Sequence, residues 1–328
     1  RILLVAGKRG GERMIKKRLL SLFALLCACW MLLSGCSGLK TRQPDEDALP
    51  ELEYTRPENE KIENRESQKT LKSQGTLSDG SDYILYANNE LEISGDVLTS
   101  KLKSEKPLTE ALKDVTVLTL NVKEIGEETC GDLSMIQSVN LGPDVTSIGD
   151  SACSALGTIQ FPASVEAIGD YAFQGCTSLW SADIPSTVTS MGAYVFTGCD
   201  SLRAVKIDTD VCESTFAECT ALRDITFQDN CRIIGECAFQ GCSGLRNLYL
   251  GANIERIERQ AFSECEKLSY IYFNKNLQYI GHLAFAGVQS LSKVEWEDKL
   301  AYLQVTREED YSKQSNLSNF FPKFKKED

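Results

Sequence analysis

The sequence has 328 residues, 42% of them hydrophobic and 25% charged, which is enough apolar material for a sizeable globular core. Its net charge of -12 disfavours nucleic acid as a partner, because an acidic surface repels the phosphate backbone. One histidine and 13 cysteines without a CxxC pair provide no zinc-type ligand spacing, so we expect neither a metal nor another cofactor.

The N-terminal segment, residues 14–35, has the layout of a secretion signal peptide. A basic start over residues 16–18 precedes an apolar run over residues 19–33, shorter than the roughly 20 residues of a membrane-spanning helix. The run closes on Leu33-Ser34-Gly35-Cys36, which resembles a bacterial lipobox. The resemblance implies that Cys36 carries a lipid and anchors the protein to the bacterial cell envelope, where we expect it to be exposed at the cell surface. An uncleaved anchor or an ordinary signal peptide is the alternative.

The segments on either side of this signal are not predicted to fold. Residues 1–13 do not fit the signal layout, and codons for Gly10-Gly11-Glu12 can spell a ribosome-binding site, so we expect translation to start at Met14. Residues 36–80 are rich in charge, Ser and Pro and poor in apolar residues, so burial cannot offset the entropy of ordering them. We predict a disordered tether over 36–80; a folded but unrecognised segment is the alternative.

Residues 81–114 are predicted to form an N-terminal cap. Two alternating runs flank Asn88-Asn89 within Asp82–Val97, which indicates a β-hairpin. Residues 107–114 are predicted to form a short helix.

Residues 115–297 repeat with a period of 23 or 20 residues, which makes about eight turns. The residue that marks each turn, here named the Phe column, is Cys130, Cys153, Phe173, Phe196, Phe216, Phe239, Phe262 and Phe285. Positions nine and eleven after it are apolar, which predicts a short strand with one inward face. An Ile-Gly pair before most of them predicts a turn, because Gly tolerates positive φ. One such coil cannot bury its apolar face alone, so stacked coils must share a continuous core.

Two units of the repeat, Phe161–Gly169 and Ile184–Gly192, resemble those of a known family. They resemble the BspA-like leucine-rich repeats of bacterial surface proteins, and the resemblance covers about residues 115–297. It implies a leucine-rich-repeat solenoid, with parallel β-strands stacked on one face and turns and short 3₁₀ or α segments opposite. It also implies attachment to protein or glycan. Residues 298–328 are expected to form a C-terminal cap and a charged tail.

Ten cysteines fall within the repeats, and most follow the repeat. Those three positions after the Phe column, the Cys column, are Cys176, Cys199, Cys219, Cys242 and Cys265. We expect this column to pack as small apolar side chains in the core, although stacking could bring neighbours within disulfide distance. A bridge among Cys212, Cys231 and Cys237 stays open.

Nothing in the sequence indicates catalysis. The one histidine, His282, falls in a variable turn, and the glycines follow the repeat rather than a phosphate-binding loop. We therefore expect a binding protein that is not an enzyme.

Candidate ligand-binding residues are those that point outward from the strands or directly precede them. Tyr249, Tyr270 and Tyr272, the Tyr patch, cluster on adjacent turns, and clustered surface Tyr is typical of binding hot spots. Trp180 and the three residues of the Arg row, Arg203, Arg223 and Arg246, share one position on successive turns. The alternative is that neither group binds a ligand: Tyr is common in strands, and the Arg row could pair with Asp200, Asp224 or Glu218.

The expected function is a lipid-anchored surface adhesion protein that recognises protein or glycan; the alternative is an envelope scaffold that docks a partner protein.

Overall fold

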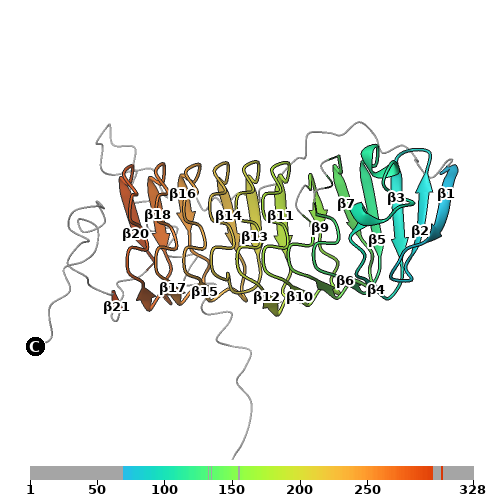
Figure 1. Ribbon diagram of the computed structural model, residues 1–328. Helices are drawn as coiled ribbons and strands as arrows, with labels where there is room; N and C mark the ends of the chain where they lie inside the picture. Colours follow the sequence, from blue (N-terminus) through green and yellow to red (C-terminus); the bar gives the residue numbers. More distant parts are fainter. Residues whose placement is uncertain (1–68, 132, 134, 154–155, 298–303, 306–328) are drawn as a thin grey trace, which may run out of the picture. The chain divides into compact units, whose positions relative to one another are not determined.

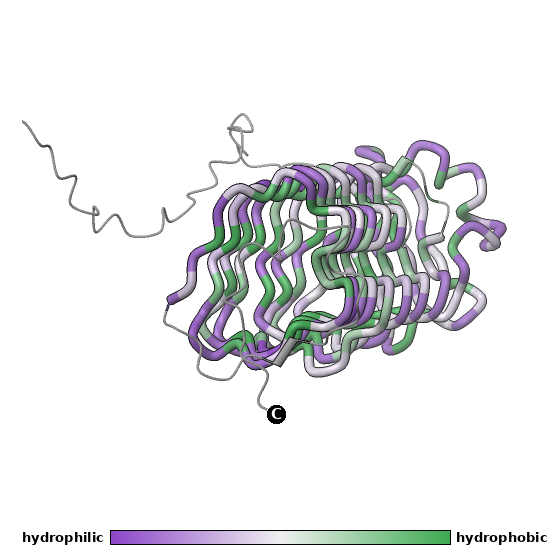
Figure 2. The backbone as a smooth tube through the Cα atoms, turned by 90° about the vertical axis from the view of Figure 1, so that its left-hand side faces the viewer, coloured by the Kyte–Doolittle hydropathy of each residue, from purple (hydrophilic) through white to green (hydrophobic). Residues whose placement is uncertain are grey.

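Stacked coils make up the part of the chain that the computed structural model describes, residues 69–131, 133, 135–153, 156–297 and 304–305 (Figure 1). The predicted signal peptide, the predicted lipid attachment site at Cys36, most of the predicted tether and most of the predicted C-terminal cap lie outside these residues. Within them, no helix is long and apolar enough to cross a membrane. The coils stack in register, so hydrophobic and hydrophilic positions each form lines along the stack (Figure 2).

Each coil contributes one longer strand to a parallel ladder, as the alternation of apolar residues predicts. Partner residues lie one coil apart; Val205, for example, pairs with Ala182 on one side and Ile225 on the other. The long ladder comprises β3 (Glu90–Ser94), β5 (Val117–Asn121), β7 (Ser138–Leu141), β9 (Ile159–Gln160), β11 (Ser181–Ile184), β13 (Ala204–Ile207), β14 (Asp224–Phe227), β16 (Asn247–Tyr249), β18 (Tyr270–Phe273) and β20 (Lys293–Trp296). Strand pairing along it is interrupted after β9 and after β14, so its strands belong to three sheets.

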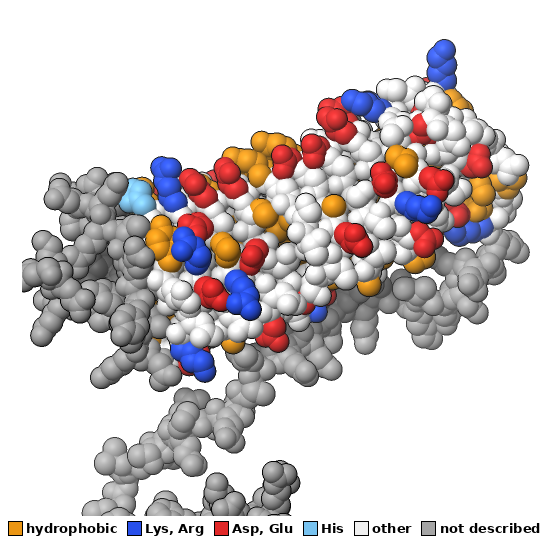
Figure 3. Space-filling model, turned by 90° about the horizontal axis from the view of Figure 1, so that it is seen from below, with side chains coloured by type: hydrophobic (Ala, Val, Ile, Leu, Met, Phe, Trp, Pro, Cys, Tyr) orange, Lys and Arg blue, Asp and Glu red, His pale blue; other side chains and the backbone are white. Residues whose placement is uncertain are grey.

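A second ladder of two-residue strands runs along the side where the sequence predicted only turns and short helical segments. It lies at the bottom of Figure 1, the side seen in Figure 3. Its strands are β4 (Val97–Leu98), β6 (Glu124–Ile125), β8 (Ser147–Ile148), β10 (Ala167–Ile168), β12 (Ser190–Met191), β15 (Ile233–Ile234), β17 (Arg256–Ile257), β19 (Tyr279–Ile280) and β21 (Gln304–Val305). They form two sheets, one from β4 to β12 and one from β15 to β21. The 3₁₀ segments of the described residues, η1 (Leu102–Ser104) and η2 (Ala111–Lys113), both belong to the cap.

The prediction that the glycine of the Ile-Gly pair adopts a positive φ is wrong. Gly169, which follows Ile168, is not in the left-handed region; a Cβ on it would lie 2.7 Å from the backbone nitrogen of Asp150 in the preceding coil. Glycine is needed because neighbouring coils approach closely there. The positive φ falls two residues later, at values of 51–59°, on Glu128, Ser151, Tyr171, Tyr194, Ser214, Cys237, Gln260 and Leu283.

The cap begins earlier than the sequence indicates. Strand β1 (Leu71–Thr76) pairs antiparallel with β2 (Asp82–Tyr86), which pairs antiparallel with β3 across a turn in which Asn89 has a φ of 63°. The hairpin at Asn88-Asn89 is confirmed, but residues 71–76 do not belong to a disordered tether. An edge strand is held through backbone hydrogen bonds, so it needs no apolar pattern that a sequence could reveal. The predicted helix over residues 107–114 reduces to η2.

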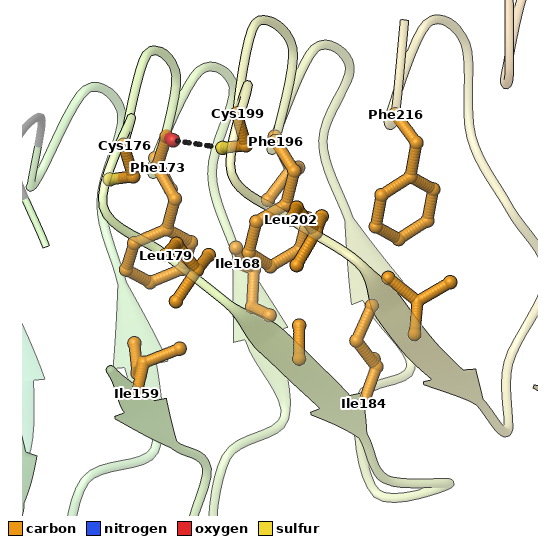
Figure 4. Close-up of a cluster of buried hydrophobic side chains, with 14 of the residues drawn as sticks. Ile159, Ile168, Phe173, Cys176, Leu179, Ile184, Phe196, Cys199, Leu202 and Phe216 are labelled. Atoms are coloured by element: carbon orange, nitrogen blue, oxygen red, sulfur yellow. Dashed lines mark hydrogen bonds between the residues drawn. The ribbon is translucent and has the colours of Figure 1, made fainter. Parts of the chain in front are cut away.

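A continuous stack of phenylalanine rings fills the core (Figure 4). Successive rings from Phe173 to Phe285 lie 5.2–5.4 Å apart between centroids and within 16° of parallel. The coils of Cys130 and Cys153 continue the Phe column at the level of the backbone. The amides of Cys130, Cys153 and Phe173 each donate a hydrogen bond to a carbonyl oxygen at the equivalent position of the next coil. This confirms that the two cysteines belong to the Phe column.

The thiols of the Cys column pack beside the rings and also donate hydrogen bonds. Each thiol donates to the carbonyl oxygen of the Phe column one coil earlier, at 3.2–3.3 Å, as from Cys199 to Phe173 (Figure 4). All ten cysteines of the described residues are free thiols, including Cys212, Cys231 and Cys237. Burial raises the pKa of Cys231 to about 12, so it remains protonated at neutral pH.

Candidate ligand-binding face

The outward side chains of the long ladder bring the Tyr patch together. Tyr249 on β16 is in register with Tyr272 on β18, and its ring centroid lies 5.3 Å from that of Tyr270. The three rings are not equally accessible: Tyr249 is 46% exposed, whereas Tyr270 and Tyr272 are half-buried. Tyr249 is thus the ring that is open to a ligand.

Tyr270 is held in place from the neighbouring strand β20. Its hydroxyl donates to the carboxylate of Glu295, and the Nζ of Lys293 lies 5.4 Å from its ring centroid. Partial burial and the Glu295 carboxylate both raise the pKa of Tyr270, so its hydroxyl stays a hydrogen-bond donor at neutral pH. A fixed Tyr270 in turn supports Tyr249, because an aromatic neighbour restricts the ring that contacts it.

The Arg row lies in the turn that leads into the long strands. Arg203 directly precedes β13, Arg223 precedes β14 and Arg246 precedes β16, so they occupy three successive coils. Their backbones are neighbours: the amide of Arg223 donates to the carbonyl of Arg203, and that of Arg203 to the carbonyl of Trp180. The guanidinium of Arg203 lies 3.9 Å from the Trp180 ring centroid, a cation–π contact.

All three arginines are exposed, and the structure shows no ion pair for them. Among the described residues, no carboxylate oxygen lies within 4.0 Å of Arg203, Arg223 or Arg246. The alternative pairing with Asp200, Asp224 or Glu218 is therefore not seen. The carboxylate of Asp200 instead accepts a hydrogen bond from Thr220.

Basic residues beside the short ladder form ion pairs, unlike those of the Arg row. Arg232 pairs with Glu255, Arg256 with Glu258 and Arg259 with Glu236, at 2.6–3.4 Å. Figure 3 shows this side, where basic side chains lie among acidic ones and hydrophobic side chains are scattered. Its cations are largely neutralised by neighbours, so it offers a weaker anion site than the Arg row does.

Sequence reasoning missed two residues that shape the site, Lys293 and Glu295. Both fall in the outward columns that hold Tyr270 and Tyr272, so the repeat alignment carried the signal for their position. It could not show that they contact Tyr270. His282 is half-buried just after β19, and in the described part of the chain no three His, Cys, Asp or Glu side chains are placed to hold a metal ion.

Parallel coils with one long-stranded face of outward polar and aromatic residues define a leucine-rich-repeat protein. The chain belongs to the BspA type leucine rich repeat family, whose model matches residues 109–213 and 208–317 in six copies. That match includes residues 115–297, where the sequence predicts the repeats.

Two solved structures of bacterial leucine-rich repeat proteins are similar to this chain. A leucine-rich repeat protein from Bacteroides ovatus ATCC 8483 is 27% identical with a TM-score of 0.56, over 65% of this chain and 58% of that one. This chain thus spans little more than half the length of that relative. The T. pallidum leucine rich repeat protein is 21% identical with a TM-score of 0.39, over 53% of this chain and 87% of that one. No curated protein matches the sequence.

Proposed function

We propose that this protein is a lipid-anchored cell-surface binding protein that recognises a protein or glycan ligand on the long-strand face. One observation carries the proposal: Tyr249 presents an open ring that Tyr270 supports, beside a row of arginines without ion pairs among the described residues. Tyr and Arg are the residues most enriched where binding energy concentrates. Membership of a repeat family with an extended surface supports a binding role rather than catalysis.

Removing the open ring of Tyr249 together with its in-register neighbour Tyr272 is expected to weaken ligand capture. The change Tyr249→Ala with Tyr272→Ala should reduce binding of envelope or host-matrix fractions by roughly 30-fold, because hot-spot aromatics contribute about 2 kcal/mol or more. The melting temperature should stay within a few degrees, because these side chains lie outside the core.

The matched control is Tyr171→Ala with Tyr194→Ala. These rings also stack, at 4.9 Å between centroids, but lie on the turns beside the short ladder. Equal losses in both double variants, or none in the first, would remove the Tyr patch from the proposal.

The anchor is proposed from the sequence alone. Cys36→Ala should move the protein from the membrane fraction to the soluble fraction and abolish incorporation of labelled palmitate, because the lipid is attached through this thiol. Protease added to intact cells should release the wild-type repeats. Survival of the repeats on intact cells, with digestion only after lysis, would contradict surface exposure and favour an internal envelope scaffold.

A further inference from the structure

The unpaired cations of the repeats share one edge of the solenoid. Of the 11 Lys and Arg residues in 115–297, seven have a carboxylate within 4.0 Å in the described structure. The four others are the Arg row and Lys267. Lys267 lies in the turn before β18, one coil beyond Arg246. All four are exposed, so cations without acidic partners occupy the same turn of four successive coils.

We propose that this edge binds an extended anionic polysaccharide, bearing carboxylate or sulfate groups, that lies along the solenoid axis. The inference rests on the proposed binding function and names the class of ligand. Arginine suits such a ligand because its planar fork can donate two parallel hydrogen bonds to a carboxylate or a sulfate.

The spacing of the row favours a polysaccharide over an acidic peptide. The Phe rings of the same three coils lie 5.2–5.3 Å apart, so neighbouring coils set the arginines roughly one strand separation, about 4.8 Å, apart. An extended peptide places side chains of one face roughly 6.7 Å apart, twice its rise per residue. A pyranose unit in an extended chain has a length close to one strand separation, so sugars and coils keep the same register along the axis. Where successive acidic sugars alternate in the side they face, every second sugar meets the cation of every second coil.

The Tyr patch continues the same edge and suits a sugar ring. The carbonyl oxygen of Arg246 accepts hydrogen bonds from the amides of Ser269 and Tyr270, so the last arginine adjoins the aromatic pair. An open aromatic face packs against the apolar C–H face of a pyranose, while the neighbouring arginine meets its acidic group. Trp180 closes the other end of the row beneath Arg203.

The acidic net charge does not prevent this contact. At physiological salt, charges more than about 8 Å away are largely screened, so a bound anion responds mainly to the cations that touch it. Binding should accordingly weaken with added salt, and more steeply when more of the row is intact.

The test compares two triple variants with the same change in charge, in the chain from residue 36 carrying Cys36→Ser. The row variant is Arg203→Gln, Arg223→Gln and Arg246→Gln; the control is Arg232→Gln, Arg256→Gln and Arg259→Gln. The control removes three arginines whose exposed ion pairs contribute little to stability. The probes are a heparin hexasaccharide, a hexamer of galacturonic acid, neutral dextran and single-stranded oligo-dT, with the dissociation constant measured at several salt concentrations.

Wild type and control should bind at least one acidic hexasaccharide, and the row variant should bind it roughly 10-fold or more weakly with a shallower salt dependence. Preference for heparin assigns sulfate recognition, and preference for the galacturonate hexamer assigns carboxylate recognition. Equal losses in both triple variants, oligo-dT binding as tightly as the sugars, or no binding of either acidic sugar would overturn the inference. If no acidic sugar binds while the Tyr249 and Tyr272 double variant still loses ligand capture, only this inference fails and the proposed function stands.

Discussion

Phe216→Ala is expected to lower the free energy of unfolding by about 3–5 kcal/mol, the range for removing a large buried aromatic. The Phe216 side chain is fully buried, and its ring stacks on Phe196 at 5.3 Å and on Phe239 at 5.2 Å. The change therefore leaves a cavity in the middle of the stack and interrupts it on both sides. In a protein of this size the melting temperature should fall by roughly 10 °C or more, as measured by circular dichroism or calorimetry.

The matched control is Phe285→Ala, at the end of the same column. Phe285 stacks on only one other ring of the column, that of Phe262, so fewer contacts are lost. Repeat proteins owe their stability to contacts between nearest neighbours, so a central interruption should cost more than one at the end. An equal or larger loss in Phe285→Ala would contradict this account of the ring stack.

The second large effect is expected in the cap, where Asp79→Ala should cost about 2–3 kcal/mol. The Asp79 carboxylate accepts hydrogen bonds from the backbone amides of Ser81 at 2.9 Å and of Thr99 and Ser100 at 2.7 Å. Removing it leaves these donors without that acceptor, and an unsatisfied partly buried donor costs about 1–3 kcal/mol. Hydrogen exchange of the Thr99 and Ser100 amides should accelerate, while the amides of the Phe column stay protected.

Acid should destabilise the cap of the wild-type protein as Asp79→Ala does, because protonation weakens the Asp79 carboxylate as a hydrogen-bond acceptor. Burial tends to raise the pKa of Asp79, but the amide donors outweigh it and lower the pKa from 3.8 to about 2. Because the folded pKa is the lower one, the stabilisation is complete above pH 4 and is lost as pH falls through the folded value. The Ser78 hydroxyl similarly lowers the pKa of Glu105.

The matched control for the cap is Asp183→Ala, which removes an exposed carboxylate from the long ladder. We expect it to change stability by less than about 1 kcal/mol. Cap amides whose protection, relative to their intrinsic exchange rate at each pH, does not change between pH 4 and pH 2 would show that the Asp79 carboxylate does not hold this loop.

The fold was predictable because a solenoid repeats one environment. Every 20–23 residues the chain returns to the same point of the coil, so positions that are buried carry apolar residues at that same period in the sequence. That is why eight turns, the inward pairs of the long strands and the buried Cys column could be derived from spacing alone. The second ladder could not, because strands of two residues are too short to show an alternation.

The candidate face was predictable only in part. The columns placed Tyr249, Tyr270 and Tyr272 on one surface and Arg203, Arg223 and Arg246 in one row. They did not show which tyrosine stays open, nor that the arginines lack acidic neighbours, because both depend on where side chains of adjacent coils reach. Asp200 and Asp224 stood close enough in sequence to suggest ion pairs that the structure does not form.

For this protein, then, the sequence by itself determined the repeat, its inward columns and the surface on which each candidate residue lies. Tertiary structure decided how residues of one column meet those of the next: the thiol bonds to the Phe column, the glycine contact between coils, the edge strand β1 and the support of Tyr249 by Tyr270. The physical reason is that residue type sets the preference for burial at each position, whereas hydrogen bonds, ion pairs and close backbone contacts depend on distances between residues a full coil apart.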